Sequence, residues 1–297
     1  MGSFKKYEGG PVFGDDTTGT VFDAYVHMEN GRYRMDFSWR PKKALAVTFS
    51  DDGLHWDEPI ITLECNPESG WEDDVNRNCV LYVDGIYKMW YTGQAKSYTY
   101  SYIGYAESKD GIHFERKVTE PILFPEYPWE KESVMCPCVI YEDGKYKMWY
   151  SAGETYEPNV NAYAESDDGI NWRKSRINPI FIRKRSNFYE KERVGGCHVV
   201  HTEDMGYLMF YIGYEDIHTA RICVAKSKNG ISCWERSPLN PLVEPTPDSW
   251  DAQATYKPTV VWNEAEGKWM LWYNGRANGK EFMGYAEFDK RELFEKN

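Results

Sequence analysis

Apolar and polar residues alternate along most of the chain, in short runs rather than in long periodic stretches. In the segment VDGIYKMWY, residues 83–91, apolar side chains stand at every second position from Tyr87 onward. Side chains of a strand point alternately to its two faces, so this spacing predicts a half-buried β-strand. The Asp-Gly pair ahead of it predicts a tight hairpin turn. No helix-period segment longer than two turns competes, so we expect an all-β protein.

The same phrase recurs along the whole chain, at intervals of about 60 residues. Its first aromatic residue stands at Tyr33, Tyr87, Tyr146, Tyr207 and Trp269. Each unit reads as an apolar strand, a turn, an alternating strand, a third strand and, after a second tight turn, a short fourth strand. Four antiparallel strands repeated five times predict a five-bladed β-propeller. The five units fill residues 1–297, so we expect a single domain.

The first strand of each propeller blade lines the central channel, so the heads of these strands should meet at one end of the axis. Alignment on the repeated phrase places five unlike residues in one column, namely Asp23, Arg77, Cys136, Gly196 and Lys257. The position two residues later is held by Tyr25, Cys79, Cys138, His198 and Thr259. Variation at equivalent positions of a repeat is typical of a site placed on a repeating scaffold. We therefore expect the functional site at this end.

The repeat, the segments DDGLHW, KDGIHF and DDGINW, and the NPI or EPI entries to the blades resemble the five-bladed propeller glycosidases. That group includes glycoside hydrolase families 43, 32, 68, 117 and 130, and the motifs do not single out one family. Asp23-Ala24-Tyr25-Val26 is similar to the Asp-Pro-x-Val motif of families 43 and 32, without the proline. The resemblance implies that Asp23 is a general base or nucleophile.

Two further carboxylates of those families have no counterpart in the same column. The resemblance places them at Cys136 and Gly196, so the usual set of three is not intact. The segment EDDVNR, residues 72–77, resembles at looser spacing the Glu-Asp-x-Arg segment of family 130. In that family an Asp supplies the acid and the Arg helps to bind phosphate or sugar.

Other carboxylates lie on the loops that enter each inner strand. Each loop opens with an aromatic residue and an acid, giving Trp71-Glu72, Trp129-Glu130, Tyr189-Glu190 and Trp250-Asp251. A feature present in nearly every unit of a repeat is favoured as structural. The acids that follow, Asp74, Glu132 and Glu192, are missing from the last unit and are better candidates for catalysis. Flat aromatic rings stack on sugar C–H faces, so Trp71 and Trp250 are candidate substrate contacts.

Glycoside cleavage requires two carboxyl groups on either side of the scissile bond. Our first hypothesis is a glycoside hydrolase with Asp23 as base and Glu192 as the preferred acid, followed by Glu132 and Asp74. Arg77 and Lys257 should lower the pKa of Asp23 by Coulomb attraction. An aromatic wall should raise the pKa of the acid by desolvation.

Two alternatives stay open. A phosphorylase would use Arg77, His198 and Lys257 to hold phosphate, whereas a non-catalytic propeller would only bind sugar. Tyr256 and His198 are candidate sugar contacts. Arg77 and Lys257 either pair with Asp23 or bind an anionic carbohydrate.

The composition of the chain limits the partners and the cell location that we expect. A net charge of -12 argues against nucleic acid, because phosphate backbones require a basic face. No stretch approaches ~18 uninterrupted apolar residues, so we expect no membrane span. The first residues lack the apolar core of a signal peptide. Seven scattered cysteines favour reduced thiols in a cytoplasm, or a periplasmic or secreted location if a leader was removed.

A metal site near the axis is the last alternative. Cys79, Cys136, Cys138, Cys197 and His198 cluster there, and thiolate and imidazole are zinc ligands. The Cys136-x-Cys138 spacing is too short for the usual zinc knuckle. Buried thiols that act as small hydrophobic residues are the favoured interpretation, so we expect no metal and no cofactor.

Overall fold

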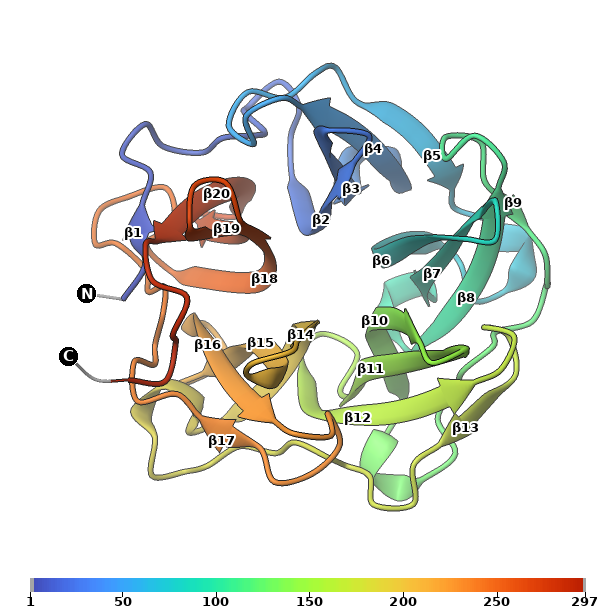
Figure 1. The fold of residues 1–297 in the computed structure, drawn as a ribbon. Coiled ribbons are helices and arrows are strands. Elements are labelled where there is room, and N and C mark those ends of the chain that lie inside the picture. The colour runs from blue at the N-terminus through green and yellow to red at the C-terminus, as the bar shows by residue number, and fades with distance from the viewer. Residues whose placement is uncertain (1–2, 296–297) are drawn as a thin grey trace.

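The computed structural model describes residues 3–295, which form strands and short 3-10 turns with no α-helix among them. In Figure 1 the strands surround a common centre, with β2, β6, β10, β14 and β18 nearest to it. The strands are β1 Lys5–Lys6, β2 Val21–Glu29, β3 Arg32–Trp39, β4 Ala44–Ser50, β5 Ile60–Glu64, β6 Asp74–Val83, β7 Ile86–Gln94, β8 Ser101–Ser108, β9 Glu115–Arg116, β10 Ser133–Glu142, β11 Lys145–Gly153, β12 Pro158–Ser166, β13 Trp172–Lys174, β14 Arg193–Thr202, β15 Gly206–Tyr214, β16 Ala220–Ser227, β17 Glu235–Arg236, β18 Ala254–Asn263, β19 Lys268–Ala277 and β20 Lys280–Phe288. The 3-10 turns are η1 Arg40–Lys42, η2 Pro67–Ser69, η3 Lys96–Tyr98, η4 Pro128–Glu130 and η5 Phe188–Glu190. The expected all-β fold is confirmed.

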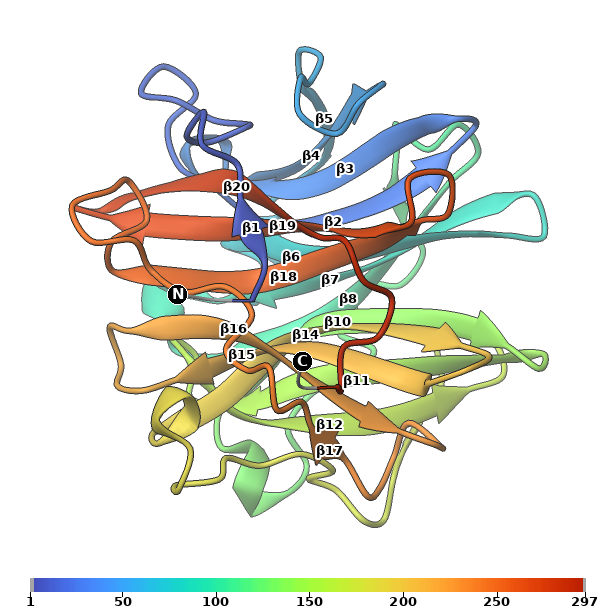
Figure 2. The ribbon, with the colours of Figure 1, turned by 60° about the vertical axis from the view of Figure 1, so that its left-hand side comes forward.

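Hydrogen bonds join the described strands into two sheets of eight strands and one of four. Inside these sheets, pairing is antiparallel within groups of four consecutive strands. Single parallel contacts, Ser133 with Ser101 and Ala220 with Ala254, fuse neighbouring groups. The last group takes its fourth strand from the N-terminus, where β1 lies along β20 (Figure 2). Three sheets do not by themselves establish five blades, so the blade count stays a prediction.

The hairpin turns have the backbone that their sequences predict. In Asn30-Gly31, Asp84-Gly85 and Asp143-Gly144 both residues have positive φ. A two-residue turn of this kind requires that conformation, which Gly adopts freely and Asn or Asp tolerate. These turns join the first and second strands of the first three groups and fix their register.

Neighbouring groups are tied together by tryptophans of their second strands. Trp90 Nε1 donates to the carbonyl of Gly169, Trp149 Nε1 to that of Gly230, and Trp272 Nε1 to that of Gly53, each at 2.7 Å. These glycines lie in the tight turns after β12, β16 and β4. The Trp rings are buried. The core therefore lies between adjacent strand groups and closes around the centre.

A bulge interrupts the inner strand of every group at the same position. The bulge residues Asp23, Arg77, Cys136, Gly196 and Lys257 all have left-handed backbone, with φ between 37° and 56°. The bulge N–H groups of the first four donate to side-chain oxygens of the preceding group, namely those of Asn274, Ser38, Thr92 and Ser151. A bulge re-aims its side chain. The column aligned from the sequence is therefore a structural one.

The aromatic-acid pairs of the entry loops are structural, as predicted. Their acids, which we call the wall acids, are at most 1% exposed, and they are Glu72, Glu130, Glu190 and Asp251. Each accepts a hydrogen bond from a tyrosine hydroxyl, those of Tyr91, Tyr150, Tyr211 and Tyr273 respectively. Each also pairs with a cation of an outer strand, in the same order Arg116, Lys174, Arg236 and Lys6. Burial of these charges is balanced by hydrogen bonds and pairing.

The cysteines are free thiols, and five of the seven are buried. Across residues 3–295 no group of three or more His, Cys, Asp or Glu side chains is placed to hold a metal ion. The same residues contain no helix that is long and apolar enough to cross a membrane.

Candidate active site

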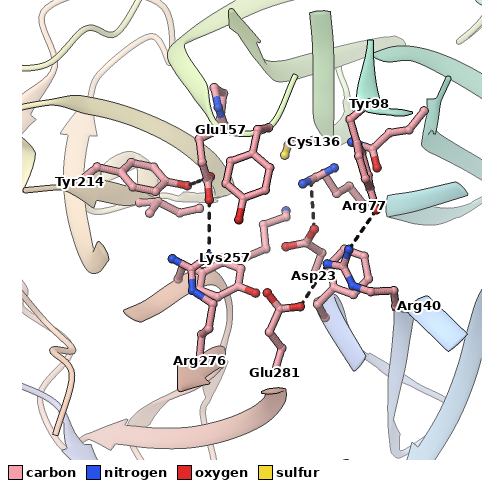
Figure 3. A pocket seen from close by; sticks show the side chains of 16 residues that line it. Asp23, Arg40, Arg77, Tyr98, Cys136, Glu157, Tyr214, Lys257, Arg276 and Glu281 are labelled. Carbon is pink, nitrogen blue, oxygen red and sulfur yellow. Dashed lines mark hydrogen bonds and ion pairs between the residues drawn. The ribbon is translucent and has the colours of Figure 1, made fainter. Parts of the chain in front are cut away.

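A pocket opens where the bulges of the inner strands converge (Figure 3). It encloses about 120 Å³. Its lining residues are Phe22, Asp23, Arg40, Arg77, Gln94, Tyr98, Cys136, Tyr156, Glu157, Pro158, Ile212, Tyr214, Tyr256, Lys257, Arg276 and Glu281. Four of these are Arg or Lys and three are Asp or Glu, so cations exceed carboxylates by one in a protein of net charge -12.

Asp23 lies at the base of this pocket and is 3% exposed. Arg77 Nε approaches its Oδ2 to 3.0 Å, but outside hydrogen-bond geometry. Oδ2 is therefore buried with no hydrogen-bond partner among the residues described. Burial raises the pKa of Asp23, although Arg77 and Lys257 act to lower it. The expected lowering of this pKa is wrong, because desolvation outweighs the two cations.

Lys257 crosses the pocket toward Arg77 (Figure 3). The side chain is buried, yet within residues 3–295 its ammonium group has no hydrogen bond or ion pair. Burial acts to lower the pKa of Lys257, but Cys136 and Asp23 outweigh it and the pKa is raised. The lysine is therefore a charged donor that has no partner among the described residues and is open to an anion that enters the pocket.

Gly196, the glycine among the five bulge residues, lies next to the side chain of Lys257. A Cβ atom at Gly196 would lie 2.6 Å from Ile212 Cδ1 and 3.4 Å from Lys257 Cδ. The backbone at Gly196 is also left-handed, which favours glycine. A Cβ atom would therefore clash with Ile212 and only touch the stem of Lys257, and both of these residues line the pocket.

Glu157 faces the same pocket from the loop between β11 and β12. Tyr214 Oη donates to its Oε2 at 2.5 Å, and Arg276 Nη1 lies 3.7 Å from its Oε1. Burial raises the pKa of Glu157, while Tyr214 and Arg276 act to lower it. Sequence reasoning missed this residue because it stands outside the repeated phrases. The only available signal was an acid before proline in a loop, GETYEPN, that differs from its sister loops.

A third carboxylate closes the pocket on the side of β20. Glu281 accepts from Arg40 Nη2 at 3.1 Å, and Arg40 Nη1 donates to Tyr98 Oη at 3.3 Å. The guanidinium group of Arg40 also stacks on Phe22, with 4.3 Å to the ring centroid. Arg40 is therefore held by several partners, in contrast to Lys257.

Four of the residues predicted from the sequence meet in this pocket, namely Asp23, Arg77, Tyr256 and Lys257. The other predicted acids do not line it. Asp74 begins β6 and is half-buried, whereas Glu132 and Glu192 are exposed. Glu192 pairs instead with Arg193, at 3.3 Å.

The remaining predicted contacts lie away from the pocket. Trp71 stacks on Tyr91, and Trp250 stacks on Tyr273, in the walls of their strand groups. His198 lines a second cavity, of about 680 Å³, at the other end of the inner strands. Its Nδ1 accepts the N–H of Val260 at 2.9 Å, and burial lowers the pKa of His198 to about 3. His198 is therefore neutral and does not line the pocket that holds the four cations.

Comparison with known proteins places this geometry in a family. A family model described as beta-1,4-mannooligosaccharide phosphorylase, glycoside hydrolase family 130, matches residues 75–295. An uncharacterized protein of Mycobacterium tuberculosis is 28% identical over 282 residues, 90% of this chain and 88% of its own. A 1,2-beta-oligomannan phosphorylase of Thermoanaerobacter sp. is 25% identical over 205 residues, 66% of this chain and 62% of its own.

Solved structures of carbohydrate-active enzymes share the fold. The beta-1,2-mannobiose phosphorylase from Listeria innocua superimposes with a TM-score of 0.69 at 15% identity, covering 96% of each chain. A structure from work on family 130 hydrolases that target beta-1,2 mannosidic linkages in Candida mannan gives 0.75 at 16% identity, covering 100% of this chain and 97% of its own. The motifs alone had not singled out one family, and the family model corrects that expectation because it spans more than half of the chain. The chain belongs to glycoside hydrolase family 130.

Proposed function

We propose that this protein is a glycoside phosphorylase that cleaves β-mannosides in the pocket at the inner-strand bulges, with inorganic phosphate as the attacking group. The observation that carries the proposal is Lys257, a buried side chain whose charged ammonium group has no partner among the described residues and lies in the pocket with Arg77. A phosphate dianion is an acceptor that satisfies both side chains. The names of the family model and of the Thermoanaerobacter relative support the substrate class.

The charged pocket residues Glu157, Arg77, Lys257 and Asp23 then have roles in the reaction. Glu157, protonated, gives its proton to the glycosidic oxygen as the bond from that oxygen to the anomeric carbon breaks. A phosphate oxygen held by Arg77 and Lys257 forms the new bond to that carbon. The proton of the hydrogen phosphate then returns to Glu157 through solvent. One glycoside and one hydrogen phosphate yield one glycosyl phosphate and one free sugar.

Asp23 orients Arg77 in this scheme. The ion pair of 3.0 Å fixes the guanidinium group, and the carboxylate partly balances the two cations before phosphate enters. Glu157 replaces Glu192, Glu132 and Asp74 as the proposed acid, because those three side chains do not line the pocket.

Hydrolysis is the second candidate, with Asp23 as the general base. The observation in its favour is that two carboxylates, the buried Asp23 and the partly buried Glu157, share one pocket, as glycoside hydrolysis requires. Water activated by Asp23 would then take the place of phosphate. For the fold, we infer that each group of four antiparallel strands is one blade, which gives a single five-bladed propeller.

The test is cleavage of β-1,2- and β-1,4-mannobiose with and without inorganic phosphate, with products followed by ³¹P NMR. Phosphorolysis predicts strict dependence on phosphate and a new glycosyl phosphate signal. Phosphate-independent release of free sugar, lost in Asp23→Asn, supports hydrolysis. Binding of mannosides with no turnover under either condition would overturn both and leave a sugar-binding protein.

A further inference from the structure

We propose that Tyr214 is a positioning residue for the cleavage reaction: it holds one oxygen of Glu157 so that the other faces the pocket as the proton donor. This inference rests on the proposed function, in which Glu157 is the general acid. The pair lies at the pocket wall in Figure 3, with Tyr214 on β15 and Glu157 on the loop ahead of β12.

The geometry assigns different tasks to the two oxygens of Glu157. Tyr214 Oη lies 2.5 Å from Oε2, and the phenol is 2% exposed. Burial and the neighbouring carboxylate hold the pKa of Tyr214 well above its ordinary value, so its hydroxyl stays a donor. Oε2 is thereby occupied as an acceptor. Among the described residues the ion-pair partner of Oε1 is Arg276, at 3.7 Å, so Oε1 is the oxygen left to carry the acid proton.

The backbone of Glu157 is fixed separately from its side chain. Arg193 Nη1 donates to the Glu157 carbonyl at 2.9 Å and to Glu154 Oε2 at 3.0 Å. Arg193 is itself buried. Loss of the Tyr214 hydroxyl should therefore release the Glu157 side chain without moving the loop.

A tyrosine and a glutamate of the wall acids supply the matched comparison. Tyr211 Oη donates to Glu190 Oε2 at 3.1 Å, the same kind of bond. The other oxygen of Glu190 is already occupied by Arg236 at 2.6 Å and by Asn187 Nδ2 at 2.8 Å. Glu190 has no oxygen free to give a proton, so its tyrosine bond serves stability alone.

The Tyr214 bond also sets when Glu157 releases its proton. The charged groups that face Glu157 are Arg276 from β19, Arg77 from β6 and Asp23 from β2. The two arginines favour the ionised form of Glu157, and the charge of Asp23 disfavours it. The hydroxyl favours the carboxylate as well, because it donates to the charged form. Its removal should make Glu157 hold its proton to higher pH, and a shift of about one pH unit is expected for one such bond.

The experiment is a ¹³C NMR titration of side-chain carboxyl carbons in protein labelled at glutamate, with the Glu157 signal assigned by its loss in Glu157→Gln. Tyr214→Phe should raise the Glu157 midpoint by about one unit, and Tyr211→Phe should leave it unchanged. If Tyr214→Phe does not fold, Tyr214→Met removes the same hydroxyl. An unchanged midpoint in the folded Tyr214 variant overturns the inference.

The activity arm separates this inference from the proposed function. In the mannoside assay the alkaline limb of kcat/KM against pH should move upward in Tyr214→Phe, with kcat lowered about tenfold by lost orientation. If Glu157→Gln abolishes turnover but the limb stays in place, the positioning role fails alone. If Glu157→Gln keeps turnover, the proposed function fails, and the NMR titration still decides whether Tyr214 controls Glu157.

Discussion

Two sets of buried or partly buried carboxylates lie in this molecule, and they differ in their hydrogen-bond and ion-pair partners. Each wall acid has a tyrosine hydroxyl and a cation in contact, as Glu190 has Tyr211 and Arg236. Among the described residues of the pocket, Asp23 Oδ2 accepts no hydrogen bond, and the ion-pair partner of Glu157 lies at 3.7 Å. Low exposure is therefore common to both sets, with Glu157 the least buried member. Open hydrogen-bonding capacity distinguishes the carboxylates that can take part in chemistry.

The largest expected effect is a loss of stability when one of the wall acids is changed. Glu190→Gln removes the charge that Arg236 faces, and breaking such a buried pair costs about 3 to 5 kcal/mol. Urea unfolding at pH 7 should show a fall of the free energy of unfolding of that size.

The matched variant in the pocket should behave oppositely. A raised folded-state pKa means that Glu157 contributes stability below its unfolded value, lost as pH rises through the folded value. At pH 7 its ionised form is a burden, so Glu157→Gln should unfold at the same urea concentration or a higher one. Equal losses in the two variants would remove the distinction between wall and pocket.

A smaller effect is expected at the phosphate site. Lys257→Met removes one charge-assisted hydrogen bond, worth about 2 kcal/mol, so the KM for phosphate should rise about thirtyfold. Initial rates at varied phosphate measure this. Lys268→Met, which breaks a pair with Glu287 outside the pocket, should leave that KM unchanged. A KM for phosphate that is indifferent to Lys257 contradicts the assignment.

The smallest effect concerns the glycine beside Lys257. Gly196→Ala places a Cβ 2.6 Å from Ile212 Cδ1, which should displace Ile212 in the pocket lining beside Lys257 and raise the KM for phosphate several-fold. Gly31→Ala is the control, because it also has positive φ but has no atom within 4 Å of the added Cβ. Both variants should lose about 1 kcal/mol of stability to backbone strain. Only Gly196→Ala should affect phosphate, and an equal response of both variants would contradict this role.

The sequence predicted the parts of the site that the repeat carries. The shared position of Asp23, Arg77 and Lys257 could be predicted because every unit has its bulge at the same offset from the repeated phrase. The strands and hairpin turns were readable for the same reason, through alternation and Asp-Gly pairs.

The acid could not be found in this way. Glu157 lies on a connecting loop, and its closeness to Tyr214 depends on how two strand groups pack. Glu192 and Glu132 were preferred because they precede inner strands. Both side chains are exposed, and neither lines the pocket that the bulge residues form. Sequence offset locates a residue along a strand, whereas the side of the strand it faces depends on the local backbone.

The most direct test of the account compares Glu157→Gln with Glu190→Gln in phosphate-dependent mannoside cleavage, at a temperature where both are folded. The two variants make the same chemical change at two glutamates, the partly buried Glu157 and the buried Glu190, and each accepts a hydrogen bond from a tyrosine hydroxyl. The account predicts that kcat falls at least about 100-fold in Glu157→Gln, as for loss of a general acid, and stays near the parent value in Glu190→Gln. Full turnover in Glu157→Gln, or equal loss in both variants, would contradict it.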